Sequence, residues 1–172
     1  MKKVVSKTVG VILLALSLTT MSANAQTNNS KEVEVVNKMF QAFGTGNMEA
    51  LKSTLSDTSV WVYYGSDLIA YSGTYKGKEE VVRFIGNIVS SVDILDFKVE
   101  QIISNGKTVV VLGSEKQKIK KNSKILEQNW VQVYTVENGL ITKMDEYANT
   151  AYSEKLFKKS RSNFQICLPK LP

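Results

Sequence analysis

Residues 108–150 read TVVVLGSEKQKIKKNSKILEQNWVQVYTVENGLITKMDEYANT, and apolar and polar side chains alternate along most of this stretch. A period of two is typical of β-strands with one buried face. The pattern predicts strands over 108–119, 125–136 and 140–150, with turns near 121–123 and at Asn138-Gly139. These residues are therefore expected to form an antiparallel meander.

Further strands are predicted before this meander. Residues 60–64 and 68–75 are rich in β-branched and aromatic side chains, which favours two short strands. A longer strand is expected to join the meander through a turn at Asn105-Gly106. One face of that strand is predicted to be apolar and carries Leu95, Phe97, Val99 and Ile103.

Three helices are predicted in the N-terminal half, where apolar residues recur at helical spacing. The first begins at a pattern that resembles a capping box, Asn29 with Glu32, and ends near Gly44. The second is short and follows Asn47, and the third opens at Gly77. The order of elements predicts an α+β fold in which three N-terminal helices pack on a strongly curved, mainly antiparallel sheet.

The first 25 residues have the pattern of a secretory signal peptide. A basic start is followed by the apolar run 9–18 and by Ala23-Asn24-Ala25, a typical cleavage sequence. The alternative, a membrane anchor, needs an apolar stretch of about 20 residues. We therefore expect cleavage after Ala25, a periplasmic or secreted protein without a stable membrane anchor, and one domain over 26–172. Its core is expected over about 31–152, with a C-terminal tail over 153–172 that starts as a helix.

Charge and residue types exclude several classes of function. The formal charge is +6, and it falls to +3 when the three lysines of the signal peptide are removed. The densest basic runs, 116–124 and 155–161, are interpreted as solvated faces, so this small surplus predicts no nucleic-acid partner. The chain has no His and a single cysteine, Cys167, which excludes His/Cys metal sites and a Ser-His-Asp relay. We predict no metal and no cofactor, and the remaining candidates are carboxylates, tyrosines and amides.

Strand alternation selects the carboxylates and amides that share one face. Along residues 108–119, Lys116, Lys118 and Lys120 must meet water, so Glu115 and Gln117 point to the concave side of the sheet. Gln128, Trp130 and Gln132 share one face of the next strand, and Met144 and Glu146 share one face of the last. For residues 60–64 the alternation alone does not decide which face lines a pocket.

Short motifs along the chain resemble the SnoaL-like family of the nuclear-transport-factor-like superfamily, over about residues 33–152. The motifs are Ser59-Val60-Trp61, residues 72–79, Gln128-Asn129-Trp130, residues 138–141 and Asp145-Glu146-Tyr147. The resemblance implies a cone with a central pocket, a homodimer, and Trp130 on the inner side. The family that the chain resembles includes polyketide cyclases, an epoxide hydrolase and ketosteroid isomerases. By this resemblance, Glu146 lies at the position of one catalytic acid.

Two functions follow as hypotheses. In the first, an exported domain binds a small, largely apolar molecule, with Glu146 as general base and Glu115 as its partner in lyase, isomerase or hydrolase chemistry. The predicted ligand contacts are Trp130, Gln128, Gln117, Met144, Tyr64 and Trp61. In the second, the cavity is filled and the domain is a non-catalytic interaction module or dimeric scaffold. Two structural alternatives stay open, an ion pair of Glu146 with Lys116 or Lys143 and a purely packed Trp130.

Overall fold

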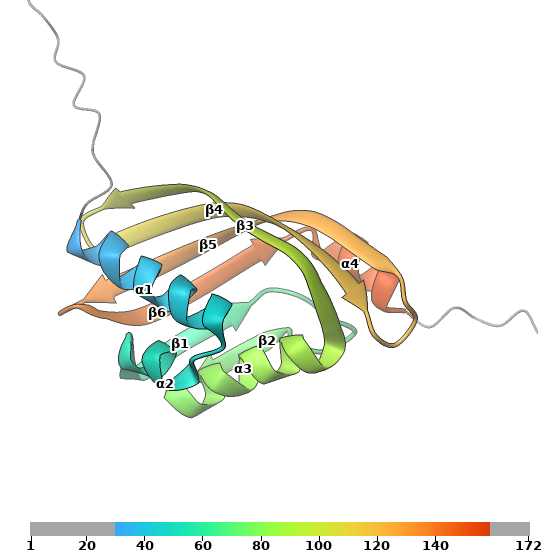
Figure 1. The fold of residues 1–172 in the computed structure, drawn as a ribbon, viewed down its shortest axis with the longest axis horizontal. Helices are drawn as coiled ribbons and strands as arrows, with labels where there is room; N and C mark the ends of the chain where they lie inside the picture. Colours follow the sequence, from blue (N-terminus) through green and yellow to red (C-terminus); the bar gives the residue numbers. More distant parts are fainter. Residues whose placement is uncertain (1–29, 159–172) are drawn as a thin grey trace, which may run out of the picture.

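Six strands form one sheet in the order β2-β1-β6-β5-β4-β3, in a computed structural model that describes residues 30–158. β1 and β6 pair in parallel, and every other neighbouring pair is antiparallel. In Figure 1, α1 lies across one side of the curved sheet, and the long β3 bends from the end of α3 to run beside β4. The elements are α1 (Lys31–Thr45), α2 (Met48–Ser53), β1 (Leu55–Tyr63), β2 (Gly73–Lys76), α3 (Lys78–Ser91), β3 (Val92–Asn105), β4 (Thr108–Ile119), β5 (Ile125–Glu137), β6 (Leu140–Ala148) and α4 (Thr150–Phe157).

The predicted α+β class and the mainly antiparallel sheet are confirmed. β4, β5 and β6 follow the predicted meander within two residues at each end. Asn138 and Gly139 both adopt positive φ angles, 52° and 76°, which suits the two-residue turn between β5 and β6. Buried and less buried residues alternate along β4 and β5, so the inner face of the sheet is the one that the sequence indicates.

β3 departs from the predicted alternation. Its pairing with β4 shifts between Ile94 and Asp96 and again between Val99 and Gln101, as β-bulges do. Each shift reverses which side chains point inward, so Leu95 and Ile103 are exposed whereas Phe97 is half-buried. The prediction of one continuous apolar face on this edge strand was therefore wrong.

α1 and α2 begin at residues whose side chains cap them. Ser30 caps α1, and its hydroxyl accepts a hydrogen bond from the backbone N–H of Val33 at 3.3 Å, in place of the expected pair of Asn29 and Glu32. Asn47 caps α2 as predicted and accepts from the N–H of Ala50 at 3.0 Å.

The predicted strand over 68–75 is shorter than expected because residues 67–71 form turns, and only 73–76 pair with β1.

A fourth helix closes the described part of the chain. Asn149 caps α4, and Phe157 at the end of the helix is buried edge-on against the ring of Tyr71, with 5.9 Å between centroids. This agrees with the predicted helical start of the C-terminal tail. The predicted signal peptide and Cys167 lie outside the described residues. Within 30–158, no helix has the length and apolar content needed to cross a bilayer.

Candidate active site

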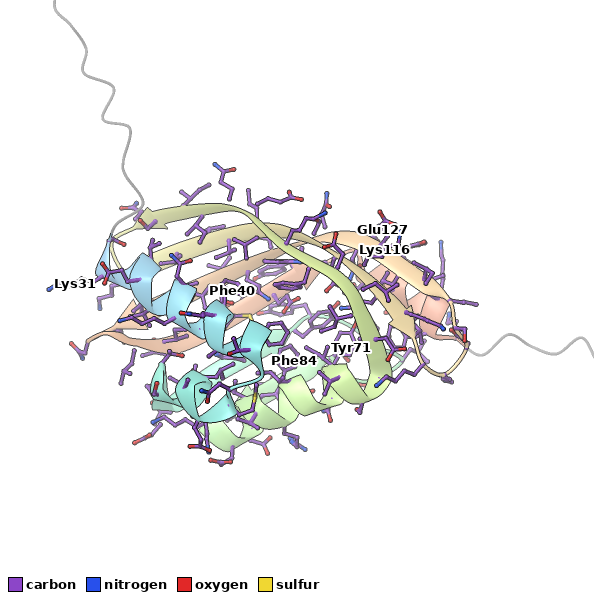
Figure 2. All side chains as sticks on the ribbon, in the orientation of Figure 1. Lys31, Phe40, Tyr71, Phe84, Lys116 and Glu127 are labelled. Atoms are coloured by element: carbon purple, nitrogen blue, oxygen red, sulfur yellow. The ribbon has the colours of Figure 1, made fainter. Side chains whose placement is uncertain are left out.

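The register of the sheet brings each candidate glutamate next to a glutamine. Glu115 on β4 lies directly opposite Gln128 on β5, and Glu146 on β6 lies opposite Gln132 on β5. All four side chains are buried. The next pair along, Lys116 and Glu127, points the other way and forms an exposed ion pair at 3.1 Å. Figure 2 labels this outer pair, and also Phe40, Tyr71 and Phe84, which gather between the helices and the sheet.

Glu115 is held by two amides. Its Oε2 accepts a hydrogen bond from Gln117 Nε2 at 2.6 Å, and its Oε1 accepts one from Gln128 Nε2 at 2.7 Å. Burial raises the pKa of Glu115, and the two amide donors oppose that rise. Both oxygens of this carboxyl group are therefore occupied by N–H donors.

Glu146 is held by one amide only. Its Oε2 accepts from Gln132 Nε2 at 2.9 Å, and within the described residues no hydrogen bond reaches its other oxygen. Burial, followed by the negative charge of Glu115, raises the pKa of Glu146 from 4.5 to about 8. Glu146 is consequently protonated in most molecules at pH 7.

Tyrosine hydroxyls complete the polar side of the site. Tyr71 donates to Gln117 Oε1 at 3.2 Å, and Tyr134 donates to Gln132 Oε1. Burial raises the pKa of Tyr63, Tyr71 and Tyr134, so all three remain proton donors. Among the described residues, the buried Trp61 indole N–H has no hydrogen-bond partner, and the buried Tyr63 hydroxyl lies near Gln128 and Tyr71 but makes no hydrogen bond of ordinary geometry.

These groups surround a small cavity, called the inner chamber here, of about 50 Å³. Such a volume has room for a few water molecules but not for a whole organic ligand. α1, α3 and β3 contribute apolar walls. The polar side chains that line the chamber are Tyr63, Tyr71, Glu115, Gln117, Gln132, Tyr134 and Glu146, and the apolar ones are Met39, Phe40, Phe43, Trp61, Phe84, Ile85, Ile88, Ile94 and Phe97.

A larger apolar depression lies beside the inner chamber and is called the outer groove here. It encloses about 740 Å³ between the C-terminal part of α1, α3 and the start of β3. The two cavities share five lining residues, so a thin apolar partition separates them. The shared residues are Phe40, Phe43, Ile85, Ile94 and Phe97.

The structure brings together four of the predicted site residues. Glu115, Glu146, Gln117 and Trp61 all line the inner chamber. Gln128 lies behind Glu115 as its hydrogen-bond donor. Their roles in binding or catalysis stay predictions.

Three other predicted ligand contacts lie away from the chamber. Tyr64 is 44% exposed, stacks on Tyr147 with 4.8 Å between ring centroids, and donates to Asp145 at 3.0 Å on the outer face. It follows the inward Tyr63 by one position, so strand alternation turns it outward. Trp130 and Met144 are fully buried in the core and do not line the cavity.

The packing of Trp130 explains why it belongs to the core. Its ring stacks on Phe97 at 5.0 Å and lies so close to Gly113 that a Cβ there would be 2.1 Å from Cζ2 of the indole.

The alternative ion pairs of Glu146 were wrong. Lys116 pairs with Glu127, and Lys143 pairs with Asp145 at 2.6 Å.

Four side chains of the candidate site escaped the sequence analysis, namely Tyr63, Tyr71, Tyr134 and Ser153. Tyr134 continues the alternation of Gln128, Trp130 and Gln132, which could have placed it on the inner face. Ser153 on α4 donates to Gln128 Oε1 at 2.8 Å, and no pattern in the sequence indicates that contact. Within residues 30–158, no three His, Cys, Asp or Glu side chains come together as a metal site would require.

The family profile of the SnoaL-like domain matches residues 36–144. The chain belongs to this family. The structure of this SnoaL-like domain resembles an NTF2-like protein of Burkholderia xenovorans LB400, with 22% identity over 74% of this chain and 96% of the other and a TM-score of 0.70. A search of curated proteins found no match.

Two further solved structures share the fold. TerC, co-crystallised with polyporic acid, is 18% identical to this chain. The match covers 76% of this chain and 100% of TerC, with a TM-score of 0.67. A protein of Jannaschia sp. CCS1 described as a SnoaL-like polyketide cyclase is 13% identical over 76% of this chain and 93% of its own, with a TM-score of 0.66. At these identities the likeness concerns the fold alone.

Proposed function

We propose that this SnoaL-like domain is exported and binds a small, largely apolar molecule whose polar oxygen enters the inner chamber. The observation that carries the proposal is that two buried donors without an ordinary hydrogen bond, the Tyr63 hydroxyl and the Trp61 indole N–H, belong to side chains that line the inner chamber. A buried donor that lacks a partner costs stability, and an acceptor oxygen would remove that cost. A carbonyl oxygen fits best because it accepts two hydrogen bonds and donates none.

The apolar body of such a ligand would lie in the outer groove. The groove has about 740 Å³, within the range of small-molecule sites, whereas the chamber has about 50 Å³. Phe40, Phe43 and Phe97 belong to both cavities, so their side chains would have to move apart for one ligand to reach both. A ligand that spans the partition would bury its apolar part against these rings and its oxygen among the donors.

The carboxyl groups suit proton transfer to or from such a ligand. Glu146 has a pKa of about 8, so its proton is exchangeable near neutral pH. Lyase, isomerase or hydrolase chemistry at a carbon next to a carbonyl would use the pair Glu146 and Glu115. Two relatives of the same fold, described as a polyketide cyclase and as a complex with polyporic acid, are consistent with a ligand of this class.

A non-catalytic module is the second candidate. The small inner chamber favours it, because about 50 Å³ is well below the ~300 Å³ at which ligand pockets begin.

A homodimer is proposed for either function. The outer face of β4 and β5 supports it, since the side chains there are apolar and only half-buried, namely Val110, Leu112, Val131 and Val133.

The two tryptophans provide an internal control for a binding experiment. The protein contains Trp61 and Trp130 only, so its NMR spectrum has two indole N–H signals. Trp61 lines the chamber, whereas Trp130 does not. We expect 1-tetralone, a bicyclic ketone, to shift the Trp61 signal more than the Trp130 signal. Tetralin has the same rings without the oxygen and should bind more weakly.

A variant separates recognition of the oxygen from general affinity for apolar rings. Tyr63→Phe removes one donor and should weaken tetralone binding about 2- to 10-fold without changing tetralin binding. Equal binding of both compounds to the wild type would contradict the recognition of an oxygen, and no binding of either would favour the module. Native mass spectrometry of the protein from its own host tests export, the dimer and any retained molecule, with Gln26 as the expected first residue.

A further inference from the structure

Each glutamine of the site has a hydroxyl group behind it. Ser153 Oγ donates to Gln128 Oε1 at 2.8 Å, and the Tyr71 hydroxyl donates to Gln117 Oε1 at 3.2 Å. Tyr134 donates to Gln132 Oε1 in the same way. Because the amide oxygen of each glutamine accepts from a hydroxyl, its NH₂ group is turned toward a carboxyl group.

The two glutamates receive unequal shares of these amides. Gln117 and Gln128 donate to the two oxygens of Glu115, one each. Only Gln132 donates to Glu146, at Oε2. A carboxyl group whose two oxygens both accept from N–H donors is favoured in its ionised form, because an N–H bond to a carboxylate is stronger than one to the neutral acid. Protonation of Glu115 would weaken both of these hydrogen bonds, whereas protonation of Glu146 would weaken only one.

We propose that Ser153 and Tyr71 are positioning residues that keep Glu115 ionised, so that Glu146 is the glutamate of the pair that holds a proton. The proposal deepens the proposed function and rests on it for its use in proton transfer to a ligand. The division of charge itself needs no ligand. It assigns the anion to Glu115 and the proton donor to Glu146, whereas the sequence suggested Glu146 as the base.

No other charged side chain lines the chamber among the described residues. β1 and the loop after it contribute Tyr63 and Tyr71, β5 contributes Tyr134, and α1 and α3 contribute only apolar side chains. The charge of Glu115 is therefore balanced by N–H groups rather than by a cation. The orientation of the amides is therefore a local control, beside burial, over which glutamate is ionised.

Ser153 gives α4 a place in this control. The family match ends at residue 144, whereas α4 begins at Thr150. Ser153 is fully buried, and its hydroxyl also lies 3.2 Å from the carbonyl oxygen of Asn149, the usual back-bond of a helical serine. The contact with Gln128 is the shorter of the two. An element beyond the matched domain thus reaches Glu115 through one glutamine.

The test is a site-resolved titration of the protein without ligand. The ¹³C signals of the glutamate carboxyl carbons are followed from pH 4 to 10, since the two sites titrate as a coupled pair. We expect Glu115 to lose its proton first. Ser153→Ala should raise the pH at which Glu115 titrates by about 0.5 to 1 unit, because its glutamine is then free to turn over.

Matched variants distinguish positioning from a loss of packing. Ser153→Thr keeps the hydroxyl and should restore the wild-type titration. Ser90→Ala removes a helical hydroxyl that bonds only to the carbonyl of Asn87, and should change nothing. Tyr71→Phe removes the second hydroxyl and should shift Glu115 in the same direction, which keeps the test open if Ser153→Ala does not fold.

Two results would overturn the proposal. One is a wild-type protein in which Glu146 titrates before Glu115. The other is a titration of Glu115 that neither Ser153→Ala nor Tyr71→Phe moves. Failure of tetralone binding would instead overturn the proposed function and leave this titration unaffected, so the two ideas fail separately.

Discussion

Replacing Glu146 by glutamine should make the stability of the protein less sensitive to alkaline pH. In the folded state Glu146 releases its proton at about pH 8, whereas its ordinary value of 4.5 applies when the chain is unfolded. Between these two values the folded state binds more protons than the unfolded state. The free energy of unfolding of the wild type therefore falls as the pH rises through this window, and becomes level above it.

The size of the effect follows from the two pKa values. The interval from 4.5 to about 8, at about 1.36 kcal/mol per pH unit, amounts to about 5 kcal/mol at most. Glu146→Gln has nearly the same shape, and its amide oxygen can still accept from Gln132. We expect the variant to match the wild type near pH 5, to exceed it by about 3 kcal/mol at pH 7, and to reach the full difference above pH 8.

Urea unfolding monitored by circular dichroism at half-unit steps from pH 5 to 9 measures this difference. Glu115 and the three buried tyrosines are present in both proteins, so their contributions largely cancel. Glu127→Gln is the control, because Glu127 lies on the exposed outer face beside Lys116 and should give a difference independent of pH. A pH-independent difference for Glu146→Gln would refute the reasoning, since Glu146 would then ionise as it does in water.

Two other substitutions test the pair of charges and the close packing. Glu115→Gln removes the negative charge near Glu146, so the pKa of Glu146 should fall below about 8. It should still stay above 4.5, because burial is the larger cause of the raised pKa. An unchanged ¹³C titration of Glu146 would contradict this prediction. Gly113→Ala should lower the unfolding free energy by more than about 2 kcal/mol, since its Cβ would lie 2.1 Å from Trp130 and 2.3 Å from the Lys98 carbonyl oxygen. Gly44→Ala in α1 meets nothing within 4 Å and should stabilise by about 0.5–1 kcal/mol, so equal melting temperatures of the two variants would count against the packing argument.

Much of the inner face could be predicted because its pattern is local. Alternation along β4 and β5 correctly placed Glu115, Gln117 and Gln128 on one side and Lys116 on the other. The same rule failed on β3, where two bulges interrupt the pairing with β4. A bulge depends on the partner strand, so the sequence of β3 alone does not reveal it.

The choice between Tyr63 and Tyr64 could not be predicted for a related reason. Both residues are aromatic, and alternation states only that they face opposite ways. The parallel pairing of β1 with β6 places Tyr63 opposite Glu146 and leaves Tyr64 near Asp145, more than 80 positions away in the chain. That pairing joins the first and the last strand of the chain and has no local signature.

The amino-acid order alone determined the class of the fold, the strands of the meander and the face that carries the two glutamates, because a period of two is a property of neighbouring residues. The tertiary structure decided the volume of the chamber, the unequal sharing of amides between Glu115 and Glu146, and the contact from Ser153. Each of these depends on side chains from different strands and from α4 meeting in space. Distances between such side chains, and the burial that raises their pKa values, exist only once the chain has folded.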